Sequence, residues 1–207
     1  MKHTMVAISE DNLKNLFIGI KEFQIEKIII VSIDKTMDNT KLSLKELKKF
    51  NIPVKIMKTE GSWSSIFKIF SDIKAANENV LVNISTAKNQ CPAICAAFVN
   101  GLKAFSVNDG EVNMLPTLNF SYYKLIPEKK LEILRVLRDD KTCCASFDEL
   151  SKKLKMSLPL VSYHINGSRK SEGLANMGLV EVNEKKGRLS INLTMLGKII
   201  IDSCPQR

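Results

Sequence analysis

The sequence predicts an α/β protein with two domains: a mostly parallel sheet flanked by helices, and then a smaller, mainly helical domain. Two observations support this prediction. Residues 5–107 alternate between short apolar runs and stretches with apolar residues at helical spacing, the order that builds a parallel sheet. After Pro116 the alternation stops, and helical patterns follow one another. We expect the first domain at 1–120 and the second at 121–207.

Short apolar runs predict the strands of the sheet. The run KIIIVS (27–32) is continuous and β-branched, which indicates a strand covered on both faces. The other runs lie at 5–9, 54–57, 79–83 and 103–107. The turn sequence Asn108-Asp109-Gly110 predicts an antiparallel edge strand at 111–116.

Amphipathic stretches between these runs predict the helices, at 10–23, 42–50, 62–76 and 92–101. The last of them ends in Asn100-Gly101, a common way to terminate a helix. The result is a Rossmann-like arrangement, which binds ligands beyond the carboxyl ends of its strands.

Polar residues gather at one of those carboxyl ends, in VLVNISTAKNQ (80–90). A strand-to-helix turn needs one or two capping residues, and this one carries more donors and a cation. Hydroxyl and N–H groups at a helix N-terminus suit a phosphate, and a lysine supplies a point charge. The alternative is that these residues only cap the helix. The candidate ligand-binding residues are Ser9, Ser32, Asn83, Ser85, Thr86, Lys88, Asn89 and Gln90.

The second domain has the pattern of a helix-turn-helix followed by a two-stranded wing and a last helix. Phe147, Leu150 and Leu154 mark one buried face of the first of the two helices. Ser157 is expected to cap the next helix, which we expect to bury Leu158, Val161 and Ile165. Its opposite face is expected to carry Pro159, Ser162, Tyr163, Asn166 and Lys170, residue types that reach base edges and phosphates.

Basic residues also flank Gly187 at the predicted wing tip, where they could lie along a phosphate backbone or in a minor groove. The alternative is a winged helix that contacts proteins, with its charges solvated. The candidate DNA-binding residues are Ser157, Pro159, Ser162, Tyr163, Asn166, Arg169, Lys170, Lys185, Lys186 and Arg188.

Composition narrows the class further. The formal net charge of +9 favours an anionic partner. No apolar run is long enough for a membrane span, and the N-terminal run is too short for a signal peptide, so we expect a cytoplasmic protein with no membrane partner. Five cysteines without a CxxC motif suggest neither a disulfide framework nor a zinc ribbon.

A few other residues have alternative interpretations. Cys143 and Cys144 lie where a redox or metal sensor could sit, but buried packing is the favoured interpretation. Cys91 and Cys95 are also expected in the core. Trp63 could stack on a base, although a core position is favoured for it too. The two histidines, His3 and His164, have no visible catalytic partner.

Three stretches carry a resemblance to a known family: VNISTAKNQ (82–90), VSYHINGSRKSEGL (161–174) and SEGLANMGLVEV (171–182). With the strand–helix order before them, they make the chain resemble archaeal CARF-type regulators with a C-terminal winged helix, where CARF stands for CRISPR-associated Rossmann fold. The resemblance covers nearly the whole chain.

In CARF-like domains the fourth strand ends in Asn-x-Ser/Thr, two small residues and Lys. Asn83, Ser85, Thr86 and Lys88 match that motif here. The resemblance implies recognition of a nucleotide, typically a cyclic oligoadenylate, in a cleft shared by two subunits. The family's loop is often rich in glycine, whereas this one has Ala87, whose methyl group would hinder a close approach of the backbone to a phosphate.

We therefore expect a homodimeric, ligand-responsive transcriptional regulator that binds double-stranded DNA. It is expected to need no cofactor or metal, to have no enzymatic activity, and to sense a nucleotide such as a cyclic oligoadenylate. One alternative is a ring nuclease that cleaves its cyclic ligand, with Ser85 and Lys88 holding the phosphate. Another is a ligand-free dimerisation platform that carries a winged helix.

Overall fold

The protein is described here by a computed structural model, which covers residues 2–9, 14–33, 47, 50–118, 120–139, 146–185 and 188–204; for Lys185 and Arg188 only the backbone is described. The chain divides into two compact units, the first reaching Tyr123 and the second running from Lys124 to Cys204. Each unit is described by itself.

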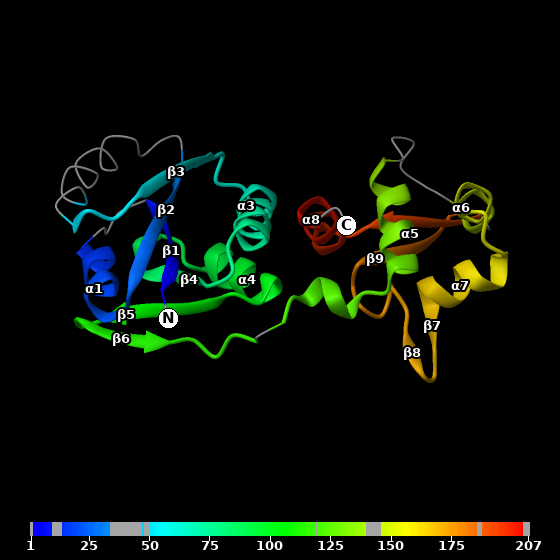
Figure 1. Ribbon diagram of the computed structural model, residues 1–207. Helices are drawn as coiled ribbons and strands as arrows, with labels where there is room; N and C mark the ends of the chain where they lie inside the picture. Colours follow the sequence, from blue (N-terminus) through cyan, green and yellow to red (C-terminus); the bar gives the residue numbers. More distant parts are fainter. Residues whose placement is uncertain are drawn as a thin grey trace. The chain divides into compact units, whose positions relative to one another are not determined.

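The first unit is built on a six-stranded sheet with the strand order β3-β2-β1-β4-β5-β6 (Figure 1). Its strands are β1 (His3–Ser9), β2 (Ile25–Ile33), β3 (Val54–Thr59), β4 (Val80–Asn83), β5 (Lys103–Asn108) and β6 (Glu111–Met114). The pairs from β3 to β5 are parallel, and β6 pairs antiparallel with β5. The predicted Rossmann-like sheet with an antiparallel edge strand is thus confirmed.

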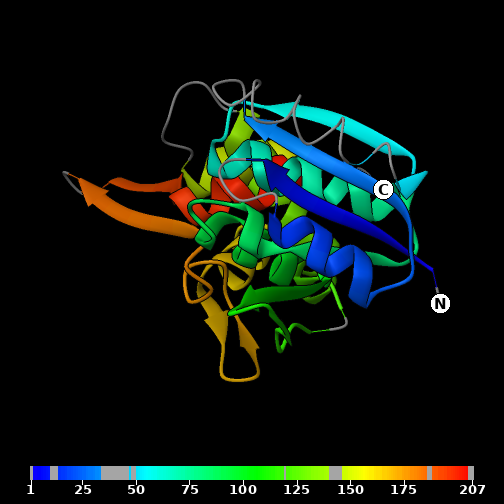
Figure 2. The same cartoon turned by 90° about the vertical axis from the view of Figure 1, so that its left-hand side faces the viewer.

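Helices cover both faces of this sheet, which is why its central strand is buried from Thr4 to Ser9. Helix α1 (Lys14–Glu22) lies over one face, in front of the sheet in Figure 2, and α3 (Trp63–Ala76) and α4 (Cys91–Asn100) lie together over the other. The core under α1 includes Met5, Ile28 and Phe105, all fully buried. Gly101 ends α4 in the left-handed conformation (φ +63°), as its position in the sequence predicts.

The helix expected at 42–50 lies largely outside the described residues. The remaining helices and strands of this unit occur where the sequence predicts them, with ends shifted by a few residues.

A short 3-10 helix, η4 (Tyr122–Leu125), leads into the second unit. That unit contains the helices α5 (Glu128–Asp139), α6 (Phe147–Leu154), α7 (Leu158–Asn166) and α8 (Met195–Ser203). Two antiparallel hairpins accompany them: β7 (Gly167–Ser168) with β8 (Ser171–Glu172), and β9 (Val180–Lys185) with β10 (Arg188–Leu193). Its core is formed by apolar residues of all four helices and both longer strands, among them Leu134, Leu150, Val161, Ile165 and Ile191.

Two expectations about α7 are wrong. The helix ends at Asn166, because Gly167 takes φ +81°, and the β7–β8 hairpin follows at once; Arg169 and Lys170 therefore lie in its turn and not on the helix. Leu158 is 45% exposed instead of buried, because it is the first residue of α7.

Among the described residues, no helix has the length and apolar character needed to cross a bilayer.

Candidate functional site

The carboxyl edge of the sheet in the first unit brings together polar residues from three neighbouring strands. Ser9 of β1 lies beside Ser32 of β2, and Asn83 of β4 lies beside Ala7 of β1. The strand order reverses direction between β1 and β4, and this is the place where sheets of this class open a crevice for ligands. Side chains alternate along a strand, so all three residues share the face that α1 covers.

Asn83 is fully buried and fastens the end of β4 to the first turn of α1. Its Nδ2 donates to the backbone oxygen of Asn15 at 3.0 Å, and its Oδ1 accepts from the backbone N–H of Ser85 at 3.1 Å. In return, the Nδ2 of Asn15 donates to the backbone oxygen of Ser85 at 3.3 Å. We call this reciprocal pair of residues the Asn15–Asn83 clasp.

The two hydroxyls after Asn83 are also bonded within the chain, in the short 3-10 helix η3 (Ile84–Thr86). Ser85 Oγ accepts from the backbone N–H of Val107 on β5 at 2.6 Å, and Thr86 Oγ1 donates to the backbone oxygen of Asn83 at 3.2 Å. Both residues are buried. Most of the donors that the sequence places at this strand end therefore brace the strand end itself.

The last three candidate residues of the segment, Lys88, Asn89 and Gln90, are exposed. Asn89 Oδ1 accepts from the backbone N–H of Cys91 at 3.2 Å, which satisfies one of the first N–H groups of α4. Gln90 occupies the N-cap position without a side-chain cap bond. Within the segment 80–90, the surface that a ligand can reach is thus formed by 88–90, directly before α4.

Ser9 and Ser32 are both buried at the same edge, with exposed fractions of 0% and 1%. Within the described part of the chain, the Oγ of Ser32 has no hydrogen-bond partner. Buried hydroxyls are usually bonded, so an unmatched one at a strand end is a feature to explain.

Three residues expected in the core of this unit are exposed. Cys91 and Cys95 lie on the outer side of α4, and burial followed by the neighbouring Cys91 raises the pKa of the Cys95 thiol. Trp63 is 36% exposed at the start of α3, with its ring 6.2 Å from that of Phe67. The buried residues of α4 are instead Pro92, Ala93, Ala96, Ala97 and Asn100.

In the second unit, α6 and α7 are joined by a turn of three residues, and polar contacts fix both the start of α6 and this turn. Ser146 and Glu149 form a reciprocal capping box at the start of α6. At its end Lys155 adopts the left-handed conformation (φ +52°), and Ser151 Oγ donates to the backbone oxygen of Met156 at 2.6 Å. Met156 is buried, so the turn is anchored in the core.

The outer face of α7 carries the polar residues expected there. Pro159, Tyr163 and Asn166 are exposed and Ser162 is partly exposed; Asn166 Nδ2 donates to Ser162 Oγ at 3.1 Å. Ser157 stands at the N-cap, but its hydroxyl makes no cap bond. Leu160, which we did not single out from the sequence, is 42% exposed on this helix.

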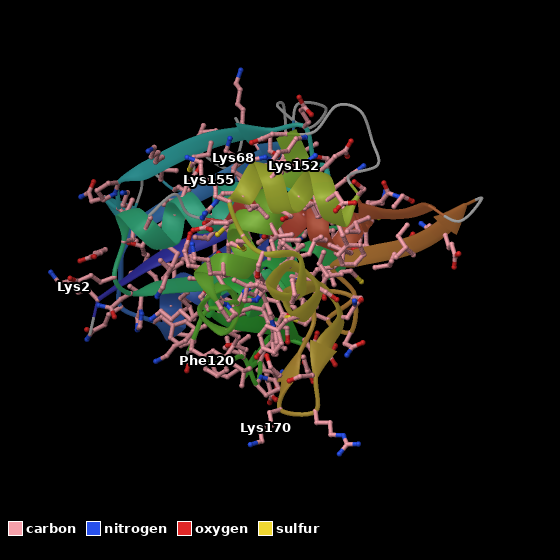
Figure 3. The ribbon with its side chains drawn as sticks, turned by 90° about the vertical axis from the view of Figure 1, so that its right-hand side faces the viewer. Lys2, Lys68, Phe120, Lys152, Lys155 and Lys170 are labelled. Atoms are coloured by element: carbon pink, nitrogen blue, oxygen red, sulfur yellow. The ribbon has the colours of Figure 1, made fainter. Side chains whose placement is uncertain are left out.

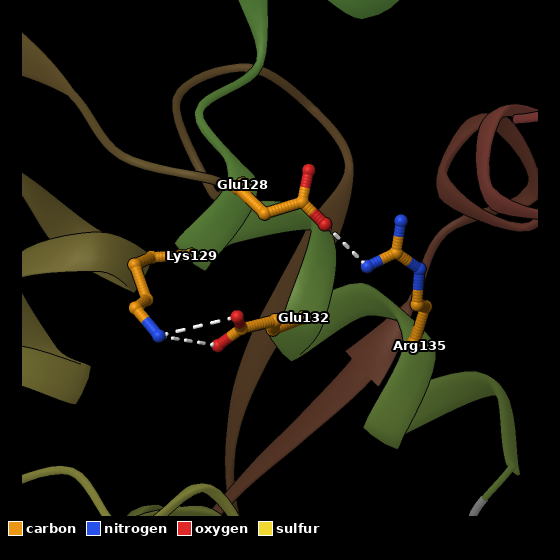
Figure 4. Close-up of polar contacts among 4 residues, drawn as sticks. All are labelled: Glu128, Lys129, Glu132 and Arg135. Carbon is orange, nitrogen blue, oxygen red and sulfur yellow. Dashed lines mark hydrogen bonds and ion pairs between the residues drawn. The ribbon is translucent and has the colours of Figure 1, made fainter. Parts of the chain in front are cut away.

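The basic residues of this unit differ in how far they are neutralised. On α5, Arg135 pairs with Glu128 at 2.6 Å and Lys129 with Glu132 at 2.9 Å (Figure 4). Arg169 and Lys170 are exposed, and within the described residues neither side chain has an acidic partner. Lys186 lies outside the described residues, and nothing is described of the side chains of Lys185 and Arg188.

Under α7 lies a buried basic residue, Lys130 of α5, which is only 4% exposed. Its ammonium donates to the backbone oxygen of Glu172. Burial, and then the positive charges of Lys130 and Lys129, lower the pKa of the nearby His164 imidazole. Burial and then Lys103 likewise lower the pKa of His3 at the start of β1.

Sequence reasoning missed Asn15, the partner of Asn83. The one signal for it was a polar residue in the first turn of an otherwise amphipathic helix. It also missed the capping box, although Ser146 and Glu149 have the required spacing. Cys143 and Cys144 lie outside the described residues. Among the residues that are described, no cluster of three or more metal-ligating side chains occurs.

The fold defines a two-unit protein with a Rossmann-like sheet domain and a second unit in which α6 and α7 are joined by a short turn. The chain belongs to the same family as a protein of Archaeoglobus fulgidus that is described as uncharacterised, with 30% identity over 183 residues, 81% of this chain and 79% of that one. No family model matches the sequence.

Two solved structures are similar in fold. One is the protein VC1899 from Vibrio cholerae, with a TM-score of 0.50 and 12% identity over 97% of this chain. The other is Can2 from Sulfobacillus thermosulfidooxidans in complex with cyclic tetra-adenylate, with a TM-score of 0.47 and 10% identity over 96% of this chain. The chain spans only 64% and 61% of these two proteins. At these identities the similarity concerns the fold alone.

The comparison with Can2 corrects one expectation. We expected from the sequence that the chain is not an enzyme, and that expectation is wrong as stated. Can2, which was solved in complex with cyclic tetra-adenylate, matches 96% of this chain with 61% of its own.

Proposed function

We propose that the protein is a DNA-binding transcriptional regulator whose second unit is a winged helix-turn-helix, and whose first unit senses a nucleotide. The observation that carries the DNA-binding part is the outer face of α7. A helix that is fixed against α6 by a capped, anchored turn presents Pro159, Tyr163 and Asn166 to solvent. A helix held in this way can enter a major groove, where an amide reads adenine.

Three further features support this assignment. The chain carries a net charge of +9, which favours a polyanion. The uncapped N-terminus of α7 leaves backbone N–H groups for a phosphate, and the exposed Leu160 can contact a thymine methyl group. In this proposal β9–β10 is the wing, and Lys185, Lys186 and Arg188 contact the DNA backbone.

The test is a selection of bound duplexes from a random library by the full chain, followed by affinity measurements on the selected site. Asn166→Ala is expected to relax the preference at one base position by about 1–3 kcal/mol while leaving non-specific binding intact. Arg188→Ala is expected to weaken binding to all sequences and to lower the salt dependence. Lys68→Ala, an exposed change on α3, is the control. If no duplex is retained above background at low salt, DNA binding is the wrong function.

We propose the nucleotide site at the carboxyl edge of the sheet, with Lys88, Asn89 and Gln90 as the contacting residues. Asn83, Ser85 and Thr86 position that segment, and Ser9 and Ser32 lie further along the same edge. A cation next to the start of α4 suits a phosphate group, and the resemblance of VNISTAKNQ to the CARF motif favours a cyclic oligoadenylate.

Calorimetric titration with cyclic tri-, tetra- and hexa-adenylate tests this site, with the linear forms as controls. Saturable binding that is lost in Lys88→Ala supports the proposal, and the absence of heat with all three refutes it. Chromatography of the same mixtures after incubation shows whether the ligand is cleaved.

The proposal includes a homodimer, because two second units would then read two half-sites about one turn of DNA apart. Ligand binding to the first units would change the spacing between the second units, and hence the affinity for DNA. Light scattering of the purified protein measures the mass of the assembly, and a monomer at all concentrations contradicts this part.

A further inference from the structure

The β7–β8 hairpin is not predicted by the helix-turn-helix pattern, although the sequence analysis names its two turn residues, Arg169 and Lys170, as candidate DNA contacts. It begins at the residue after α7 and returns at Gly173, with a turn formed by Arg169 and Lys170. Figure 3 shows Lys170 at the far end of this hairpin, with its side chain directed away from the ribbon. A hairpin of this size is not stable alone, so its surroundings must hold it.

Two glycines close the base of the hairpin by bringing its backbones together. A Cβ on Gly173 would lie 2.3 Å from the backbone nitrogen of Gly167 and from the backbone oxygen of Ile165. A Cβ on Gly167 would lie 2.4 Å from the nitrogen of Gly173, and its φ of +81° also favours glycine. No larger residue fits at either position without displacing the backbone.

Hydrogen bonds then fasten this base to the rest of the unit. Leu174 N donates to the backbone oxygen of His164 at 2.9 Å, and Ala175 N donates to that of Ile165 at 2.9 Å. The buried ammonium of Lys130, on α5, also donates to the backbone oxygen of Glu172 in β8. A buried ammonium needs hydrogen-bond acceptors, and the carbonyl of Glu172 supplies one, so this bond joins β8 to α5.

The turn itself is exposed and basic. Ser168, Arg169 and Lys170 are all exposed, and Ser168 Oγ accepts from the backbone N–H of Lys170 at 3.3 Å, which fixes the turn. The one acid of the hairpin, Glu172, lies at its base. Lys129, Arg135 and Arg138 of α5 pair with acids, whereas the two basic residues of this turn have no acidic partner within the described residues.

We propose that the β7–β8 hairpin is a separate nucleic-acid contact, which places Arg169 and Lys170 on the phosphate backbone beside the base pairs that α7 reads. This inference rests on the proposed DNA-binding function. The hairpin continues from the C-terminal end of α7, so it meets DNA when α7 does. Its rigid base fixes where the two charges lie, and phosphate contacts of this kind set the position of a protein on DNA without reading its sequence.

The test compares Arg169→Ala/Lys170→Ala with Lys68→Ala/Lys74→Ala in the full-length protein. Both double variants lose two positive charges, and the control removes them from exposed positions on α3. For the hairpin variant, the slope of log K against log salt concentration should fall by about 1.8, because each phosphate contact contributes about 0.9. The control slope should be unchanged. Arg169→Lys/Lys170→Arg keeps both charges and should restore the wild-type slope.

A hydroxyl-radical footprint on a long duplex gives a second readout. The hairpin variant should lose protection at phosphates that flank the site while keeping the protection at its centre. An unchanged slope and footprint overturn the inference, as does a variant that loses sequence preference instead of salt dependence. With either result the proposed function still stands if the wild type binds DNA and Asn166→Ala relaxes the sequence preference. A wild type that binds no duplex refutes the proposed function and this inference together.

Discussion

Replacing Asn83 by alanine should destabilise the first unit strongly, because its buried amide joins two elements. The change removes the hydrogen bond to the Asn15 backbone oxygen (3.0 Å) and the one from the Ser85 backbone N–H (3.1 Å). The N–H of Ser85 then loses its partner inside the protein, whereas the carbonyl of Asn15 keeps the intrahelical bond that its place in the first turn of α1 provides.

The size of the effect follows from these two groups. Each backbone group left without a partner costs about 1–3 kcal/mol when water cannot reach it. Asn15 is only partly buried and its carbonyl stays bonded within α1, so its share is that of one lost hydrogen bond, about 0.5–1.5 kcal/mol. The expected loss in the free energy of unfolding is therefore about 2–4 kcal/mol. For a unit of this size, that lowers the melting temperature by about 8–16 °C.

Urea unfolding followed by tryptophan fluorescence measures this loss in the correct unit, because Trp63 is the single tryptophan of the chain and lies on α3. Asn113→Ala, the same change at an exposed position of β6, is the control and should stay within about 0.5 kcal/mol of the wild type. If Asn83→Ala is equally stable but no longer binds a nucleotide, the clasp is not structural and Asn83 is a ligand residue.

Other changes test further parts of the structure. Gly101→Ala should cost the first unit more than Gly110→Ala in the same urea assay. Both glycines have positive φ, but an added Cβ meets the backbone of Phe120 at 2.5 Å in the first case and nothing within 4 Å in the second; equal losses would contradict the close approach. The pKa of His164 is lowered on folding, so the unfolded chain binds more protons and the second unit should lose stability as the pH falls below about 6.5. Hydrogen exchange of α7 amides at pH 5 and pH 7 measures this, and a His164→Gln variant with an equally steep loss would rule out this histidine as the cause. The raised pKa of the Cys95 thiol predicts that its alkylation rate, measured by mass spectrometry, keeps rising above about pH 8.5, the ordinary pKa of a thiol. A rate that levels off at about pH 8.5 would contradict this prediction.

The sequence predicts most of the sheet, because its signals are local. Each strand is a short apolar run, and Asn108-Asp109-Gly110 contains the turn that reverses β6. The end of α7 was mispredicted, because Gly167 stops the helix while the polar residues after it continue a plausible helical face. Gly167 is required by its close approach to Gly173 and by its positive φ, and neither feature is visible in the periodicity of the sequence.

The strand-end cluster shows the same limit for the site. The excess of polar residues after β4 is visible in the sequence, but their partners are on α1 and β5, far away in the chain. Residue types alone could not separate the side chains that brace the strand from those that face solvent. The structure separates them by burial, because Asn83, Ser85 and Thr86 are buried whereas Lys88, Asn89 and Gln90 are exposed.

The position of β1 in the sheet has a consequence for the synthesis of the protein. β1 leaves the ribosome well before β4, a strand with which it pairs and which begins at Val80. Because synthesis adds about 5–20 residues per second, the edge of β1 that pairs with β4 stays unpaired for roughly 4–15 s. During that time an apolar strand that ends up fully buried has an open edge, which is a template for aggregation. Chains that terminate before Val80 should therefore depend on chaperones, whereas longer nascent chains can close the sheet.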